Sequence, residues 1–307
     1  MIISASRRTD IPAFYSEWFI NRIRAGYCCA VNPFNRKQVS YVSLQPPDVD
    51  VIVFWTKDAG PLLRYLGELD SRGFRYYFQY TITGYPRVIE PNTPPLEQSV
   101  GTFARLSDML GKRRVIWRYD PIMFSTLTTP SYHRRRFTEL ADALASHTTR
   151  VVISIVDRYR AAARRLARLA QHGVEEIAAP VGSSDFDATL EDMVACADSH
   201  GLRVSSCAEE IDLTRYGVVP GKCVDDELIR EVFHVEVSHR KDTSQRKECG
   251  CVVSRDIGCY DTCLHGCEYC YATRSNVTSA NANRDHHSDS PSMVGWHDCV
   301  RPHMALF

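Results

Sequence analysis

Residues 51–83, VIVFWTKDAGPLLRYLGELDSRGFRYYFQYTIT, contain one complete strand–helix–strand pattern. The β-branched and aromatic run at 51–55 predicts a strand, and a similar run at 76–83 predicts a second one. A segment with helical periodicity lies between them at 59–72, and Gly73 follows it, where a glycine commonly ends a helix. This stretch therefore predicts a βα unit of a parallel α/β fold.

The same pattern recurs along the chain. Strands are predicted at 2–6, 27–31, 51–55, 76–83, 114–119, 151–156, 175–180 and 202–206, and helices at 12–25, 59–72, 97–112, 131–147, 158–172 and 187–200. About eight such units indicate an α/β protein with a TIM-like (β/α) barrel, closed or partly open, and a doubly wound open sheet is the alternative. We expect three regions: a barrel body over 1–206, a cysteine-rich iron–sulfur segment that completes the barrel over 207–275, and an irregular tail over 276–307.

Composition excludes several classes of protein. Among the 307 residues, Lys and Arg number 37 and so do Asp and Glu, so overall charge gives no reason to expect nucleic-acid binding. The arginine-rich segments 133–137 and 158–169 are expected to be solvated faces of outer helices, with a nucleic-acid patch as the weaker alternative. No apolar run is long enough for a membrane span, and the N-terminus lacks the pattern of a signal peptide. Twelve cysteines in such a chain predict reduced thiols in a cytoplasmic protein, and clustered thiols there usually bind metal.

Polar and charged residues follow most of the predicted strands. In parallel α/β folds the residues at the carboxyl ends of the strands meet at one mouth, where isolated charges need partners or ligands. For any one of them, helix capping or simple surface placement is the alternative, and Asp10 before Ile-Pro is a good cap candidate. The candidate catalytic residues are Arg8, Asp10, Lys57, Arg118, Asp120 and Glu209.

The densest group of cysteines contains Cys263, Cys267 and Cys270 in a C-x3-C-x2-C spacing. Three thiolates in one tight loop can hold three irons of a [4Fe-4S] cluster and leave the fourth iron open. A structural zinc site is the alternative, because zinc takes four closed ligands and further cysteines lie nearby at 249–259. The spacing favours the cluster with one open iron site. His265, inside the same loop, is expected to face solvent.

This spacing, with Tyr269 before the third cysteine, resembles the signature of the radical S-adenosylmethionine enzymes, which use full or partial β/α barrels. The resemblance implies that the open iron binds S-adenosylmethionine and that an electron from the cluster splits its sulfonium to give a radical. In most of that superfamily the motif lies near the N-terminus, so its late position here implies a circularly permuted barrel, in which residues 251–258 lie beside the strand at 2–6. The residues expected to bind the adenosyl cofactor are Ser4, Ser6, Arg7 and Tyr269.

A narrower resemblance covers nearly the whole chain. It is carried by SRRTDIPAFY (6–15), NPFN (32–35), FWTK (54–57), FQYTITGY (78–85), IWRYDP (116–121), SCAEEIDL (206–213), GKCVDD (221–226) and CGC…SRDIG…CLHGCEYCYA (249–272). These segments resemble the bacterial family called domain of unknown function 1848. That family has a C-terminal cysteine cluster similar to the radical enzymes' motif, so the resemblance implies the cofactor and leaves the substrate open.

A second set of cysteines lies outside the triplet: Cys207, Cys223, Cys249 and Cys251. Four thiolates can enclose a second iron–sulfur cluster, which we favour, and a closed zinc site is the alternative. Cys28 and Cys29, in a predicted strand, are expected to pack in the core, and Cys299 has no predicted role.

Together these patterns predict an iron–sulfur enzyme that reductively cleaves S-adenosylmethionine and performs radical chemistry on an unknown substrate. Such an enzyme needs an electron donor, for example a ferredoxin or a flavodoxin. The alternative is a non-catalytic protein that binds zinc or transfers electrons through an iron–sulfur centre. No membrane partner is predicted.

Overall fold

The computed structural model describes residues 1–35, 37–157, 159–177 and 181–300. Its centre is a sheet of eight parallel strands in the order β10-β1-β4-β5-β6-β7-β8-β9. No pairing between the end strands β9 and β10 occurs in the described part of the chain, so the sheet stays open. The predicted parallel α/β fold is confirmed in this form, and the closed barrel is not observed.

The sheet strands are β1 (Ile2–Ala5), β4 (Val51–Thr56), β5 (Tyr76–Thr81), β6 (Val115–Ile122), β7 (Arg150–Ile155), β8 (Arg203–Ser206), β9 (Val219–Pro220) and β10 (Arg255–Asp256). The α-helices are α1 (Ile11–Phe14), α2 (Ser16–Ala25), α3 (Gly60–Leu63), α4 (Leu66–Ser71), α5 (Leu96–Leu110), α6 (Pro130–Leu144), α7 (Arg160–Gln171), α8 (Ser184–Ser199), α9 (Asp226–Phe233) and α10 (Asn276–Arg284). The 3-10 turns are η1 (Pro46–Asp48), η2 (Ala145–His147) and η3 (Thr214–Tyr216).

Alternate residues of each strand enter two separate hydrophobic clusters. Phe54, Phe78 and Trp117 belong to the larger one, which the crossover helices cover. Their neighbours Val53 and Tyr77 belong to a second cluster, which packs against residues 222–252 and not against a crossover helix. This separation follows from the period of two along a strand, which sends successive side chains to opposite faces.

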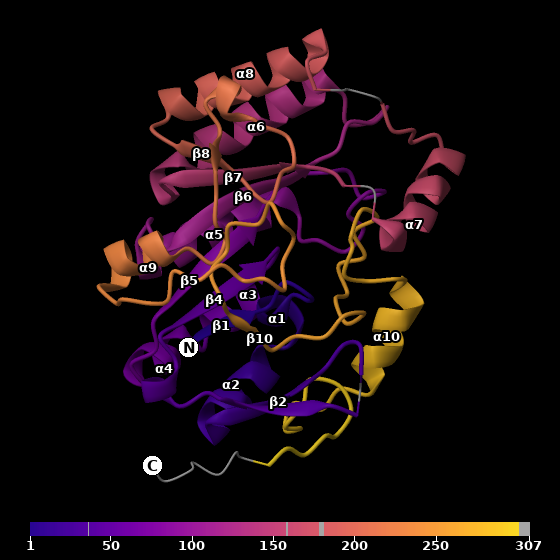
Figure 1. The fold of residues 1–307 in the computed structure, drawn as a ribbon. Coiled ribbons are helices and arrows are strands. Elements are labelled where there is room, and N and C mark those ends of the chain that lie inside the picture. The colour runs from indigo at the N-terminus through magenta and orange to yellow at the C-terminus, as the bar shows by residue number, and fades with distance from the viewer. Residues whose placement is uncertain (36, 158, 178–180, 301–307) are drawn as a thin grey trace.

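The segment 222–252, which we call the plug, covers one face of the sheet. Figure 1 shows this orange segment running across the sheet from the β8 edge toward the β1 edge. Val224, Leu228 and Ile229, the last two on α9, are buried against the strands. The Tyr77 hydroxyl donates to the Cys223 carbonyl at 2.6 Å, which joins the plug to the centre of the sheet. The plug lies on the face that would be the interior of a closed barrel.

Two predicted strands do not join the sheet. Residues 27–31 form β2 (Tyr27–Val31), but this strand pairs antiparallel with β3 (Val39–Ser43) in a separate hairpin. Of the predicted strand 175–180, residues 178–180 lie outside the described residues, and Glu176 forms an isolated antiparallel bridge with Ser125. The sheet gains β9 and β10 instead. Each has two residues, too few for any periodicity to reveal in the sequence.

β10 pairs with β1, which confirms the prediction that residues 251–258 lie beside the first strand. The Asp256 carboxylate accepts hydrogen bonds from the hydroxyls of Ser4 and Ser6, both at 2.7 Å. It also accepts from the backbone N–H groups of Arg7, at 3.0 Å, and Gly258, at 2.9 Å. A side chain at 258 would collide with Ser6, because its Cβ would lie 2.2 Å from the Ser6 Oγ. Asp256 therefore holds the cysteine-rich end of the chain against its beginning.

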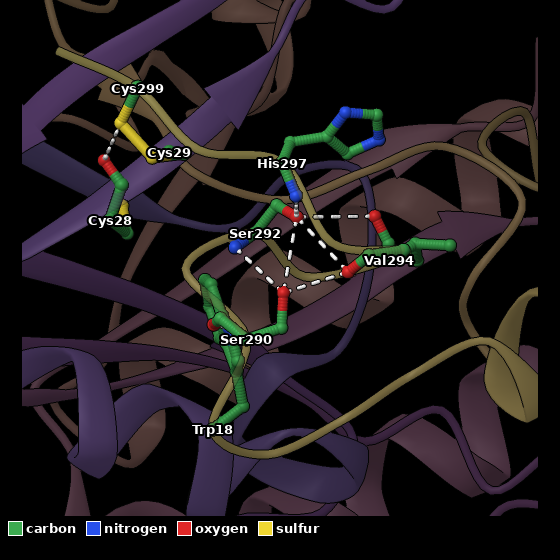
Figure 2. The surroundings of a disulfide bond; sticks show 9 residues. Trp18, Cys28, Cys29, Ser290, Ser292, Val294, His297 and Cys299 are labelled. Atoms are coloured by element: carbon green, nitrogen blue, oxygen red, sulfur yellow. Dashed lines mark hydrogen bonds between the residues drawn. A yellow bond between two sulfur atoms is a disulfide. The ribbon is translucent and has the colours of Figure 1, made fainter.

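The segment after α10 packs on α2 and on the hairpin. Trp18 donates its indole N–H to the Ser290 carbonyl at 2.9 Å, and Cys29 donates its backbone N–H to Pro291. Cys29 also forms a disulfide bond with Cys299 (Figure 2). The expectation that every thiol is reduced, and that Cys29 only packs in the core, is corrected by this bond, which joins parts of the chain that local sequence could not pair. The other ten cysteines form no disulfide.

None of the helices within the described residues combines the length and the apolar character that crossing a bilayer requires.

We predict that Asp256→Ala destabilises the protein by about 2 to 4 kcal/mol, because it leaves several donors at the β1–β10 contact without their charged acceptor. Urea unfolding followed by circular dichroism measures this change. The control is Asp50→Ala, since Asp50 pairs with the N-terminal amine and its side chain is 40% exposed. Exposed pairs contribute less than about 1 kcal/mol. Equal effects of the two substitutions would contradict the role given to Asp256.

Candidate functional site

A cavity of about 480 Å³ opens at the carboxyl ends of the strands. Its lining includes five of the six predicted catalytic residues: Arg8, Asp10, Lys57, Arg118 and Asp120. It also includes all seven predicted metal-binding cysteines: Cys207, Cys223, Cys249, Cys251, Cys263, Cys267 and Cys270. The two cysteine sets, which the sequence presents as separate groups, therefore border the same space.

The cysteine triplet lies in a loop that a buried arginine anchors. Arg165, on α7, is 2% exposed. Its guanidinium donates to the backbone carbonyls of Glu268, at 3.1 Å, and of Cys270 and Thr273. Figure 1 shows α7 beside the gold segment that contains this loop, away from the paired helices α6 and α8. The sequence predicted α7 as a solvated outer helix. Its other arginines fit this description, but Arg165 does not.

The loop 86–95, which follows β5, holds the triplet loop from another side. Glu268 donates its backbone N–H to the Ile89 carbonyl at 3.0 Å. Asn92 donates its backbone N–H to the His265 carbonyl at 3.1 Å and its side-chain amide to the Leu264 carbonyl at 2.9 Å. The triplet loop therefore owes its shape to several distant segments of the chain.

His265 is buried, which corrects the expectation that it faces solvent. Its Nε2 lies 2.8 Å from the Asp10 carboxylate. Asp10 also accepts from the Thr56 hydroxyl at 2.8 Å, and from the backbone N–H groups of Lys57 at 2.7 Å and Ala13 at 2.9 Å. Asp10 is thus both the predicted cap of α1 and the anchor of the cysteine loop. Because its carboxylate is already bound to all of these groups, we assign Asp10 a positioning role.

Lys57 and Glu90 form a buried ion pair on the cavity wall, with 2.9 Å between the Lys57 Nζ and the Glu90 Oε1. The same carboxylate oxygen accepts from the hydroxyls of Thr83, at 2.8 Å, and Tyr269. Burial raises the pKa of Glu90, but the Lys57 ammonium and these hydroxyls outweigh it, so the net shift is downward. Burial alone would lower the pKa of Lys57, but the Glu90 carboxylate has the larger effect, so the pKa of Lys57 is raised. Both groups stay charged.

Glu90 was not predicted from the sequence. It lies in an irregular loop with no strand directly before it, so the strand-end rule could not select it. Tyr269 was predicted as a cofactor-binding residue, and the structure places it in the cavity wall with its hydroxyl on Glu90.

Arg118 and Asp120, on β6, connect the sheet to the second cysteine set. The Arg118 guanidinium is 4% exposed and donates to the Asp120 carboxylate. Its Nη1 also donates to the Cys223 Sγ at 2.8 Å and to the Gln79 Oε1 at 3.2 Å. Asp120 accepts in turn from the Ser154 hydroxyl. Burial alone would lower the pKa of Arg118. The Asp120 carboxylate and the neighbouring sulfurs raise this pKa by more than burial lowers it, so the guanidinium is charged.

The four cysteines of the second set form a chain of contacts, in the order Cys207, Cys223, Cys251 and Cys249. The Cys207 and Cys223 sulfurs are 3.3 Å apart. The Cys251 sulfur accepts from the backbone N–H groups of Cys223 and Val224, both at 3.3 Å, and its thiol neighbours include Cys249. These contacts join the residue that follows β8 to residues at the start and at the end of the plug.

The remaining predicted residues surround this centre. The Arg8 guanidinium lies over the Tyr260 ring, 5.3 Å from its centroid. Glu209 accepts from the Ile155 N–H at 2.8 Å, does not border the cavity, and has its pKa raised to about 7 by burial. Ser4 does not border the cavity either, whereas Ser6 does; both hydroxyls are bonded to Asp256.

Two polar atoms at the cavity have no hydrogen-bond partner within the described residues: the Thr9 Oγ1 and the Arg7 Nη2. Both residues line the cavity, and Thr9 is 6% exposed. Unpartnered buried polar atoms are uncommon in folded proteins and are usually satisfied by ordered water, an ion or a ligand.

In the part of the chain that the structure describes, no group of three or more His, Cys, Asp or Glu side chains is arranged to hold one metal ion. A four-iron cluster has a different requirement, because each thiolate binds a separate iron and the sulfurs border a volume instead of one point. Cys263, Cys267 and Cys270 all line the cavity and form no disulfide. Their number and chemistry match the three thiolate ligands that such a cluster takes.

The fold and this site define a class: a parallel α/β protein with an open sheet, a plugged face and a cysteine-lined cavity at the strand ends. The family model described as "Domain of unknown function (DUF1848)" matches residues 2–272, and the chain belongs to this family. The match covers the sheet, the plug and both cysteine sets, and it ends before α10. A search of the curated proteins found no match.

We predict that Arg165→Ala loosens the cysteine loop without unfolding the sheet. The substitution removes a charged donor from three backbone carbonyls, and each such bond contributes about 1.5 to 3 kcal/mol. Amide hydrogen exchange of residues 263–273 should accelerate by about tenfold or more. The matched control is Arg164→Ala, which changes the adjacent, exposed arginine and should leave exchange in the loop unchanged. An unaltered loop in Arg165→Ala would show that α7 does not anchor it.

We predict that Lys57→Met destabilises the protein by about 3 to 5 kcal/mol, since it leaves the Glu90 carboxylate buried without its cation. The double variant Lys57→Met/Glu90→Gln should regain stability, with a coupling free energy of about 1 to 3 kcal/mol. Thermal and urea unfolding of the wild type, both single variants and the double variant measure this coupling. Strictly additive effects would show that the two charges do not depend on each other.

Proposed function

We propose that the protein is an iron–sulfur enzyme that cleaves S-adenosylmethionine reductively and uses the resulting radical on a substrate held in the same cavity. Cys263, Cys267 and Cys270 would bind the catalytic cluster. The strongest support is the position of the three thiols of the C-x3-C-x2-C motif. They line a cavity at the strand ends, and several charged side chains line the same cavity. Functional sites of parallel α/β proteins occupy this position.

When bound, a cluster held by three thiolates supplies an open iron and the electron that splits the sulfonium of S-adenosylmethionine into a thioether and a carbon radical. The protein's own part is to position the thiols and to keep water away. Arg165 and the loop 86–95 fix the triplet loop through its backbone. The aromatic rings of Trp55, Tyr269 and Tyr271 line the cavity.

The polar groups of the cavity suit a ligand with a carboxylate and hydroxyls. Thr9 offers an unpartnered hydroxyl for such groups. Among the described residues, the polar contacts of the Arg8 guanidinium are long, at 3.4 Å to the Gly258 carbonyl and 3.9 Å to Asp256, so we propose that it can also bind a carboxylate. Lys57 and Arg118 are already paired with Glu90 and Asp120, which suits them to setting the local field and the shape of the wall.

The proposal predicts a measurable reaction. Protein purified without oxygen should contain iron and sulfide, and dithionite with S-adenosylmethionine should yield 5′-deoxyadenosine. Cys267→Ala should abolish 5′-deoxyadenosine and remove about four irons per chain, because the cluster loses one of only three ligands. Cys196→Ala is the control, since Cys196 lies on α8, outside the lining of the cavity, and should behave like the wild type.

The alternatives give different results in the same experiment. If iron and sulfide are present and are lost in Cys267→Ala, but no 5′-deoxyadenosine forms, the protein is an electron-transfer protein and not an enzyme of this kind. Zinc without iron after reconstitution would leave a non-catalytic zinc protein.

A further inference from the structure

Four thiols lie together beside two guanidinium groups, where both ends of the plug meet the carboxyl end of β8. Cys207 follows β8, Cys223 begins the plug, and Cys249 and Cys251 lie at its end. All four border the cavity, and all four are free. The Cys207 and Cys223 sulfurs are 3.3 Å apart, so they touch without being bonded.

The groups around these sulfurs are donors. The Arg118 Nη1 donates to the Cys223 sulfur at 2.8 Å. The backbone N–H groups of Cys223 and Val224 both donate to the Cys251 sulfur at 3.3 Å. Sulfur is a weak acceptor when it is a neutral thiol, and it accepts strongly as a thiolate. The arrangement therefore suits negatively charged sulfurs.

Four thiolates with a divalent zinc ion, or with a cluster core of the same charge, carry about two negative charges. Two cations lie beside them, of which Arg118 is buried. Arg118 contacts Cys223, and Arg7 lies close enough for the Cys251 sulfur to interact with its charge. The Arg7 Nη2 is buried and has no hydrogen-bond partner in the described structure. A charged centre at the sulfurs would give this donor its acceptor.

We propose that Cys207, Cys223, Cys249 and Cys251 form a second, closed metal centre of four thiolates, filled by a thiophilic metal, either one zinc ion or an iron–sulfur cluster. In the described residues the four sulfurs are not arranged around a single ion, so metal binding would include a movement of these side chains into a closed set. Closing the ligand set would fix both ends of the plug to β8. The plug would then be held by the metal in addition to its apolar contacts with the sheet. Because the same four residues line the cavity, this centre would also form one wall of the space that the triplet borders.

This centre does not depend on the proposed function. The triplet and the second set share no ligand, so each can be removed while the other remains. A failure to form 5′-deoxyadenosine leaves the second centre untouched, and loss of the second centre leaves the triplet with its three thiols.

The test uses the full chain with Cys263, Cys267 and Cys270 all replaced by Ala, reconstituted anaerobically with iron and sulfide or with zinc. Metal content and X-ray absorption at the metal edge are then measured. We expect the variant to retain about one zinc, or about four irons with sulfide, coordinated only by sulfur. Zinc identifies a mononuclear site and iron identifies a cluster. Adding Cys223→Ala should release the metal, and adding Cys196→Ala, outside the cavity, should not.

Three results would overturn the proposal: no metal in the triplet variant, coordination that includes nitrogen or oxygen, or a Cys207–Cys223 disulfide in protein kept without oxygen. If the triplet variant does not fold, the metal content of the reconstituted wild-type protein tests the proposal instead. Reconstituted wild type should contain about eight irons, or about four irons with one zinc. About four irons and no zinc, with the iron lost in Cys267→Ala and retained in Cys223→Ala, would show that the second centre does not form.

Discussion

The Asp10 carboxylate is the contact on which the arrangement of the site depends. It is buried, and its partners belong to three elements: the start of α1, the end of β4 and the cysteine loop through His265. A buried carboxylate is stable only when its lone pairs are satisfied, so these elements must meet in one geometry. That geometry brings the triplet loop, which comes late in the chain, to the first two strands of the sheet.

A second constraint is the open sheet. An open parallel sheet exposes two apolar faces, and both must be covered. Crossover helices cover one face, and the plug covers the other up to the level where the cavity begins. The plug carries Cys223 at its start and Cys249 and Cys251 at its end, so covering this face also places thiols at the strand ends. Packing and site are therefore produced by the same segment.

Several features of the site had a signal in the sequence, and others did not. The strand-end rule selected Arg8, Asp10, Lys57, Arg118 and Asp120, and the cavity contains all of them, because parallel strands end at the same edge. Other features depend on distant contacts. Glu90 lies in an irregular loop, Arg165 looks like one more arginine of a polar helix, and His265 is buried by Asp10. Each needs a partner far along the chain, which no local pattern reveals.

By itself, the sequence determined the parallel α/β class, six of the eight sheet strands, and the cysteine triplet, whose members are close because the chain is short between them. Periodicity and spacing are local, and those features are local too. Only the tertiary structure decided that the sheet stays open, that its edge strands have two residues each, and that the hairpin β2–β3 stands apart. It also decided that both cysteine sets face one cavity and that Cys29 is joined to Cys299. These depend on contacts between segments remote in sequence, which form only when the whole chain packs.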